Sequence, residues 1–183
     1  RGSEIRLARK MDALVEIIKM LAGDVDLDEL LSLIATQTSE IMNAERSTIY
    51  LIEEARGELW SKVAQELGVL EIRLKRGQGL AGQAWETGRS IISHDVYSDP
   101  RFDPQFDRLT GWRTKDLVVV PMCNYEGNVM GVLEVMNHRS GHFSRKDEEL
   151  LAALASAADV ALETARLRSR ATQDFVTGLC NRG

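Results

Sequence analysis

The chain has 183 residues, of which 44% are apolar and 28% are charged, as in an average soluble globular protein. A formal net charge of -5 argues against a nucleic-acid partner, and no apolar run approaches the roughly 18 residues of a membrane span. We therefore expect one folded domain with no membrane partner. The two cysteines, Cys123 and Cys180, form no CxxC pair, so we expect free thiols and a cytoplasmic location.

The chain begins with two helical patterns. Apolar residues at three- and four-residue spacing predict a terminal helix within residues 1–22, which Gly23 ends. Asp26 and Glu29 then form a capping box, and the apolar face that follows predicts a second helix to about Met42.

The middle of the chain changes to short runs of β-branched and alternating residues. These runs predict strands at 47–52, 58–64, 71–74, 90–93, 117–122 and 129–136. A short helix over 79–86 interrupts them. Residues 94–111 have no sustained period, so we expect a long irregular loop of the kind that carries function.

A final helix is predicted from Ser144, an N-cap with Asp147 three residues later, to about Ala171. Its candidate seam positions are Leu151, Leu154, Ala158, Ala161 and Ala165. Either the terminal helices are plain core helices or, as we expect, they form a homodimer. The order of elements predicts an α+β sandwich with one helix leading in and one leading out.

The run Gly77-Gln78-Gly79-Leu80-Ala81-Gly82 matches GxGxxG, the pattern of dinucleotide-binding loops. The helix that follows is too short for a parallel crossover, which argues against that fold. Two interpretations stay open: a tight structural turn, or backbone amides at a helix N-terminus that favour an anion.

Metal and catalytic chemistry find no support in the sequence. The histidines His94, His138 and His142 do not fall into metal-ligand spacing with the cysteines, so we expect no metal and no cofactor. No serine lies in a recognisable nucleophile elbow. We therefore expect no catalytic residue and no enzymatic activity.

Five motifs follow one another in the order of a known family. They are Gly79-Leu80-Ala81-Gly82, Asp99-Pro100-Arg101-Phe102, Thr110-Gly111-Trp112-Arg113-Thr114, Val120-Pro121 and Gly131-Val132-Leu133-Glu134-Val135-Met136-Asn137. Through them, residues 27–167 resemble a GAF domain. The resemblance implies a central antiparallel sheet with helices on one side, a helix-bearing ligand loop on the other, and long terminal helices.

More narrowly, the chain resembles the cyclic-nucleotide-binding GAF domains of phosphodiesterases and bacterial adenylyl cyclases. Their Asn-Lys…Phe-x-x-x-Asp-Glu signature falls on Asn137, His138, Phe143 and Asp147. In the family the lysine pairs with the aspartate and holds the lid over the ligand. The resemblance thus implies a clasp between His138 and Asp147, in which histidine, unlike lysine, titrates near neutral pH.

The resemblance also implies a ligand, cAMP or cGMP, of which we favour cAMP. The contacts carried over by position are the backbone amides of Leu80 and Ala81 for the phosphate, Asp103 and Asp107 on the lid around the base, and Thr110, Arg113, Thr114 and Glu134 along the pocket. The aromatic residue that stacks on the purine in some members has no counterpart in Val63-Ala64-Gln65.

Residues 174–182 resemble the turn that opens GGDEF diguanylate cyclase domains, with Val176 where leucine is usual. This implies a signalling and dimerisation helix over 1–22, a GAF domain over 23–168, and a linker with the first GGDEF residues over 169–183. We expect a bacterial sensory domain that controls a C-terminal diguanylate cyclase.

This function has three alternatives. A ligand-free GAF module that only dimerises stays open. A bilin pigment is not expected, because no cysteine lies in the loop where a pigment would attach. A thiol enzyme of the methionine sulfoxide reductase type would need more cysteines than the two in this chain.

Overall fold

The computed structural model describes residues 27–61 and 71–180, with the side chains of 28–61 and 71–167. Its elements in chain order are α2 (Leu27–Ile41), β1 (Ala44–Glu53), β2 (Glu58–Ser61), β3 (Ile72–Lys75), α3 (Gly79–Thr87), β4 (Ile91–Ser93), the 3-10 helix η1 (Val96–Ser98), α4 (Gln105–Thr110), β5 (Leu117–Cys123), β6 (Val129–His138) and α5 (Arg145–Cys180). The helix predicted within 1–22 and the stretch Val63-Ala64-Gln65 lie outside the described residues.

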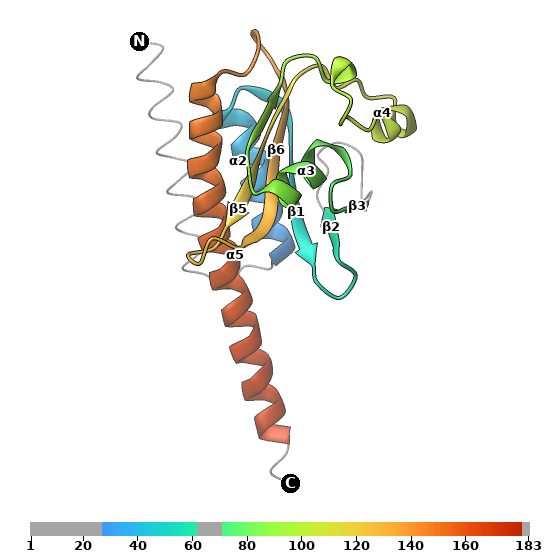
Figure 1. The fold of residues 1–183 in the computed structure, drawn as a ribbon. Helices are drawn as coiled ribbons and strands as arrows, with labels where there is room; N and C mark the ends of the chain where they lie inside the picture. The colour runs from blue at the N-terminus through green and yellow to red at the C-terminus, as the bar shows by residue number, and fades with distance from the viewer. Residues whose placement is uncertain (1–26, 62–70, 181–183) are drawn as a thin grey trace, which may run out of the picture.

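Six strands form one antiparallel sheet in the order β3-β2-β1-β6-β5-β4 (Figure 1). The two longest strands, β1 and β6, pair at its centre, with Thr48 opposite Glu134. Successive residues of a strand point to opposite faces. In β5, Val118 therefore belongs to the core on one face of the sheet and Val119 to the core on the other.

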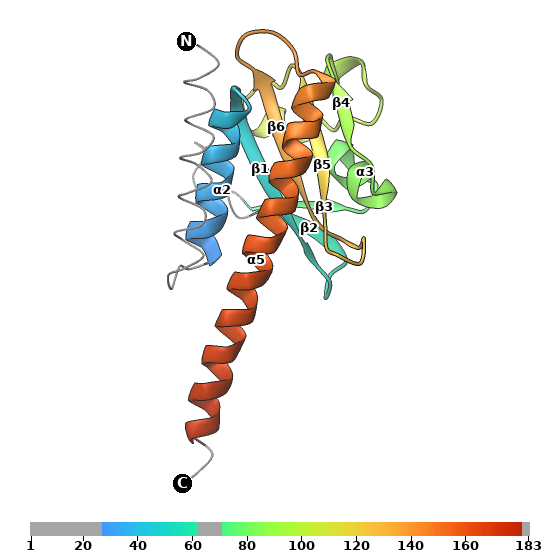
Figure 2. The same ribbon diagram turned by 90° about the vertical axis from the view of Figure 1, so that its left-hand side faces the viewer.

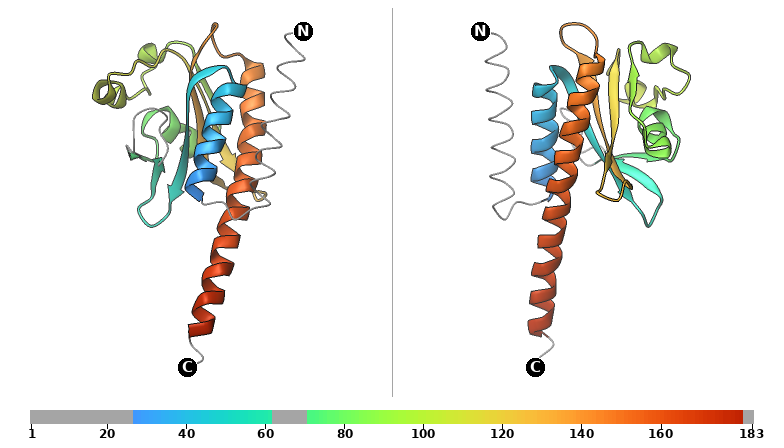
Figure 3. Two further views of the ribbon diagram at one scale, coloured as in Figure 1. Left: turned by 180° about the vertical axis from the view of Figure 1, so that it is seen from behind. Right: turned by 60° about the vertical axis from the view of Figure 1, so that its left-hand side comes forward.

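The two faces of the sheet carry different elements (Figures 2 and 3). Helices α2 and α5 cover one face, where Leu30, Ile34 and Leu151 pack against the strands. Helix α3 and the segment that carries η1 and α4 lie on the other side (Figure 3). The predicted α+β architecture, with helices on one side and a helix-bearing loop on the other, is confirmed.

Several boundaries differ from the prediction, and strand β1 begins at Ala44 rather than at residue 47. Residues 94–111 are not wholly irregular, because they contain η1 and α4. Helix α4 has six residues, too few for a 3.6-residue period to show in the sequence, and ends at Gly111 with φ 68°. Strand β6 continues two residues further than predicted, to His138. Helix α5 continues to Cys180 rather than about Ala171, since no glycine or proline occurs between Gly141 and Gly178.

The apolar seam predicted on α5 packs within the chain itself. Leu151, Ala158 and Ala161 are buried, and Leu154 and Ala165 pack against the same core. These five positions therefore join α5 to its own domain, and they are not free to face a second copy. No helix in the described ranges, the 36-residue α5 included, has the length and apolar character of a membrane span.

We predict that the cap of α5 stabilises the fold. The Ser144 hydroxyl donates to Asp147 Oδ2 at 2.7 Å, and Ser144 N donates to the same oxygen at 2.8 Å. Ser144→Ala should lower the free energy of unfolding by about 1 kcal/mol. Ser156→Ala, an exposed position on the same helix, is the control and should be neutral or slightly stabilising. Equal melting temperatures for the two variants would contradict the cap.

Candidate ligand-binding site

Residues 96–114, here called the lid, carry η1 and α4 and lie on the α3 side of the sheet (Figure 1). A cavity of about 90 Å³ lies between the lid, α3 and the sheet. Its walls are Arg46, Thr48 and Tyr50 of β1, Ile72 and Leu74 of β3, Gly79, Leu80 and Ala81 of α3, Phe102, Asp103, Phe106, Asp107, Thr110, Trp112 and Thr114 of the lid, Leu117 of β5, and Glu134 and Met136 of β6.

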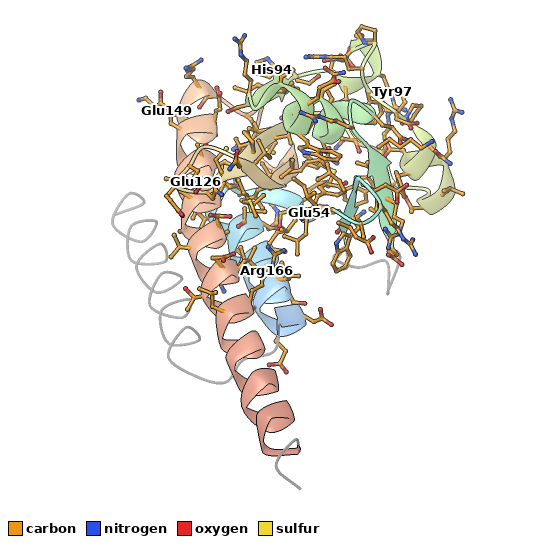
Figure 4. All side chains as sticks on the ribbon, turned by 60° about the horizontal axis from the view of Figure 1, so that its bottom comes forward. Glu54, His94, Tyr97, Glu126, Glu149 and Arg166 are labelled. Atoms are coloured by element: carbon orange, nitrogen blue, oxygen red, sulfur yellow. The ribbon has the colours of Figure 1, made fainter. Side chains whose placement is uncertain are left out.

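The cavity brings together most residues that the sequence placed at a ligand. Seven of the eight predicted contacts line it: Leu80, Ala81, Asp103, Asp107, Thr110, Thr114 and Glu134. Arg113 does not, because its guanidinium stacks over the ring of Tyr97 at 4.4 Å. Figure 4 shows Tyr97 on the lid side, far from Glu149 on α5. Arg113 thus packs on an exposed lid side chain and not in the cavity wall.

Asp107 is the residue that fastens the lid. Its carboxylate, 8% exposed, accepts hydrogen bonds from Thr114 N at 2.7 Å, Thr114 Oγ1 at 2.8 Å and the Tyr97 hydroxyl at 2.8 Å. These bonds join the lid helix α4 to both ends of the lid. Both carboxylate oxygens are therefore used within the protein, whereas the sequence had assigned Asp107 to the base of a nucleotide.

Glu134 is a buried carboxyl group in the opposite wall, 7% exposed and in the electrostatic field of Asp107. Burial raises its pKa from the ordinary 4.5 to about 7, and the negative charge of Asp107 adds to the rise. Tyr50 also lines the cavity. Burial raises the pKa of its phenol well above the ordinary value, and the charge of Glu134 adds to the rise. Near neutral pH, Glu134 is thus present both as an acid that donates a hydrogen bond and as a carboxylate that accepts one.

The sequence analysis did not assign to the ligand site a cation and four aromatic side chains that line the cavity, Tyr50 among them. The guanidinium of Arg46 lies 3.9 Å from the centre of the Trp112 ring, and the rings of Phe102 and Phe106 also line the space. The indole N–H of Trp112 is buried and has no acceptor among the described residues. Unsatisfied buried donors are uncommon and often mark functional sites. Trp112 belongs to the motif Thr110–Thr114, which the sequence analysis identified. No local sequence pattern, however, connects Trp112 to Arg46.

The first turn of α3 forms the end of the cavity. Gln78 precedes it and makes no side-chain cap. Its amide instead accepts from Lys75 N at 3.0 Å and donates to Asp103 of the lid at 3.2 Å. Amides in the first turn of a helix have no acceptor within the helix and carry partial positive charge. The end of the cavity that Leu80 and Ala81 line therefore carries the partial positive charge of a helix N-terminus.

The glycines of the GxGxxG run have structural roles at this turn. Gly77 and Gly79 have φ of 79° and 64°, which favour glycine. A Cβ atom on Gly82 would lie 2.7 Å from the Lys75 carbonyl oxygen, so only glycine lets α3 approach the end of β3 this closely. Of the two interpretations left open by the sequence, the tight turn is the one that the structure shows; Leu80 and Ala81, which follow it, line the cavity.

The family model described as GAF domain matches residues 26–162. The chain belongs to the GAF domain family. Among solved structures, the GAF domain of a phosphoenolpyruvate-protein phosphotransferase from Coxiella burnetii superposes with a TM-score of 0.74 at 22% identity, over 87% of this chain and 96% of that one. A free methionine-R-sulfoxide reductase from Neisseria meningitidis superposes with a TM-score of 0.68 at 25% identity, over 85% of this chain and 89% of its own.

Two curated relatives are phosphodiesterases of Drosophila. The dual 3',5'-cyclic-AMP and -GMP phosphodiesterase 11 of Drosophila melanogaster is 28% identical over 90% of this chain and 12% of its own length. The cGMP-specific 3',5'-cyclic phosphodiesterase of Drosophila ananassae is 26% identical over 88% of this chain and 15% of its own length. This GAF domain chain thus spans less than a fifth of these relatives.

The signature residues of the GAF domain lie where the lid returns to the sheet. Asn137 is 2% exposed, and its side chain accepts from Lys115 N at 2.7 Å and donates to Arg113 O at 3.0 Å. It therefore ties the end of the lid to β6. Its backbone φ of 57° is one that asparagine tolerates better than most residues.

The other signature residues lie at the end of β6 and at the start of α5. The ring of His138 lies edge-on to Phe143, with centroids 5.2 Å apart, and its Nδ1 accepts from Ser140 N at 3.3 Å. Asp147 accepts from Ser144 and caps α5. The clasp between His138 and Asp147 that the resemblance implies stays a prediction.

Metal ligands do not gather in the described part of the chain. Within 28–61 and 71–167, no three His, Cys, Asp or Glu side chains form a group able to hold a metal ion. Cys123 is a free thiol on an exposed residue. Partial burial of the sulfur raises its pKa, and the nearby charge of Asp159 adds to the rise. The polar chemistry that we describe is that of hydrogen bonds and charges around the cavity.

Glu134 predicts a pH dependence of stability. Between the ordinary pKa of 4.5 and the folded value of about 7, the unfolded chain loses a proton that the folded chain keeps. Stability therefore falls as pH rises through this window and levels above it. Glu134→Gln has no proton to lose at this position. The free energy of unfolding of the variant minus that of wild type should therefore increase by about 2–4 kcal/mol between pH 4.5 and pH 8.

Denaturant titrations across that pH range measure the effect. Glu126→Gln, on the exposed β5–β6 hairpin, makes the same chemical change and controls for net charge. A difference between Glu134→Gln and wild type that stays constant with pH would show that Glu134 does not keep its proton in the fold.

Proposed function

We propose that this GAF domain is a regulatory module that binds a cyclic nucleotide in the cavity under the lid and catalyses no reaction. One observation carries the proposal: the uncapped first turn of α3, the buried Glu134 and four aromatic rings line one cavity. An anion-binding end beside an aromatic and hydrogen-bonding wall matches a molecule with a phosphate at one end and a purine at the other.

The phosphate is assigned to the α3 end of the cavity. Backbone amides of Leu80 and Ala81 supply donors there, and the helix dipole adds partial positive charge. Arg46, 6% exposed, brings a full positive charge into the same walls. Asp107 opposes an anion, so we place the phosphate away from Asp107 and the base beneath it. Asp103, which accepts from Gln78 at 3.2 Å, lies at the phosphate end, so the helix amides and Arg46 must outweigh its charge there.

We favour cAMP over cGMP. Guanine presents adjacent N–H donors, which a free carboxylate would accept, but both oxygens of Asp107 already accept bonds from Thr114 and Tyr97. Glu134 with its raised pKa can both donate to and accept from an adenine edge. The names of the Drosophila relatives, which include both cyclic nucleotides, support the ligand class and leave this choice to experiment.

The output is assigned to α5. This helix packs on α2 and the sheet and continues beyond the domain body (Figures 1 and 2). We propose that it works in a homodimer and leads to a C-terminal diguanylate cyclase in a bacterial, cytoplasmic signalling protein. The support for that output is the resemblance of residues 174–182 to the start of a GGDEF domain.

Calorimetry with cAMP, cGMP and adenosine tests the ligand. We predict heat with cAMP, weaker binding of cGMP, and the weakest binding of adenosine, which lacks the phosphate. Asp107→Ala and Thr114→Ala should each weaken cAMP binding by about 1–3 kcal/mol, because each releases buried hydrogen bonds that hold the lid. Thr87→Ala, at the exposed end of α3, is the matched control and should bind as wild type.

Mass spectrometry of the denatured protein identifies any ligand that copurifies. The absence of both a copurified nucleotide and a heat or thermal shift with millimolar cAMP or cGMP would overturn the proposal. That pair of results would favour the alternative of a ligand-free GAF module that only dimerises.

A further inference from the structure

The two ends of the lid lie side by side at one end of the sheet. Strand β4 leads into the lid, β5 leads out of it, and these two strands pair with each other. The backbone N–H of Val96, the first residue of the lid, donates to the carbonyl of Lys115 at 3.1 Å. A change in the lid therefore acts first on the residues that flank it, among them His94 and Asp116.

These two flanking residues hold the main chain of Phe143. His94 Nε2 lies 2.9 Å from the Phe143 carbonyl oxygen. A carbonyl oxygen only accepts, so Nε2 carries the hydrogen of this bond. The Asp116 carboxylate accepts from Phe143 N at 3.2 Å and from His138 N at 3.1 Å. One residue from each end of the lid thus binds Phe143, and we call these three residues the Phe143 clamp.

Phe143 stands at the start of α5. It is 1% exposed, and its ring belongs to the core that α2 and α5 form with the sheet. The next residue is Ser144, which caps α5. The Phe143 clamp therefore joins the lid, on the α3 side of the sheet, to the first turn of the helix on the other face. In the view of Figure 4, His94 lies between Tyr97 of the lid and Glu149 of α5.

The Asp116 side of the clamp is buried and continuous with the lid. Asp116 is 2% exposed, and its carbonyl accepts from Asn137 N at 2.9 Å. The Asn137 side chain in turn holds Lys115 N and the carbonyl of Arg113. Breaking one of these bonds would leave a buried polar group without a partner, which costs free energy. The end of the lid and Phe143 therefore move together.

We propose that the Phe143 clamp couples the cavity to α5: closure of the lid over a ligand passes through His94 and Asp116 to Phe143 and the cap of the helix. The inference rests on the proposed function, to which it adds the route of regulation. His94 and Asp116 are positioning residues, because the cavity walls do not include them. Coupling is reciprocal, so a ligand that steadies the lid also steadies the first turn of α5.

Amide exchange at the start of α5 tests this coupling. The amides of Phe143, Asp147 and Glu148 are hydrogen-bonded, so their exchange reports local opening. In wild type, saturating cAMP should slow their exchange by about fivefold, a common size for coupling between sites. His94→Leu removes the bond to the Phe143 carbonyl and should abolish this slowing, while calorimetry still shows that cAMP binds. Equal slowing in His94→Leu and wild type would overturn the proposal.

Two further variants separate coupling from a merely structural role. His94→Gln restores an N–H donor and should recover the slowing. His142→Leu removes a neighbouring imidazole that is 65% exposed and leaves both bonds to Phe143 in place, so it is the matched control and should respond as wild type. A loss of slowing in His142→Leu equal to that in His94→Leu would assign the effect to the histidine pair and overturn the clamp.

A measurement without ligand keeps the clamp testable if the ligand proposal fails. Tyr97→Phe removes one of the bonds that hold Asp107, and Asp107→Ala removes all three. Where exchange in the lid rises, exchange over residues 143–148 should rise with it, and His94→Leu should prevent that second rise. Absence of cAMP binding to wild type would contradict the proposed function alone. A released lid with unchanged exchange over 143–148 would overturn the clamp.

Discussion

The carboxylate of Asp107 is the constraint on which the site depends. It lies on a six-residue helix, and it receives three hydrogen bonds that join this helix to Tyr97 before it and Thr114 after it. The lid is joined to the rest of the domain by Asn137, by the contact of Gln78 with Asp103, by the stacking of Arg46 on Trp112 and by the packing of Val96 in the core. A buried charge that makes good hydrogen bonds can hold a short loop in one conformation, whereas its removal leaves the donors unpaired.

The fixed charge of Asp107 also sets the character of the cavity. Burial raises the pKa of the Glu134 carboxyl group to about 7, and the nearby charge of Asp107 adds to this rise. The cavity therefore joins a carboxyl group that both donates and accepts with a helix N-terminus that only donates. This combination suits a ligand with distinct polar ends.

Sequence patterns predicted the long helices and strands better than the short ones. The apolar spacing of α2 and the Ser144 cap of α5 located both helices, and β-branched runs located the strands. Helix α4 was missed, because six residues carry no readable period. On α5, only burial shows that Leu151 and Ala158 face the domain while Val160 faces outward. For the site, family motifs located Glu134 and Thr114, but the pairing of Arg46 with Trp112 joins positions far apart in the chain, and no local pattern records it.

Amide hydrogen exchange with and without saturating cAMP tests the central claim most directly. If the ligand lies between the first turn of α3 and a lid held by Asp107, exchange should slow at Leu80, at Ala81 and along residues 96–114, with Thr114 among the most protected. Exchange in α2 should not change, because this helix lies on the other face of the sheet. Slowing on α2 while the lid and α3 stay unchanged, in protein that binds cAMP by calorimetry, would place the ligand elsewhere and contradict the claim.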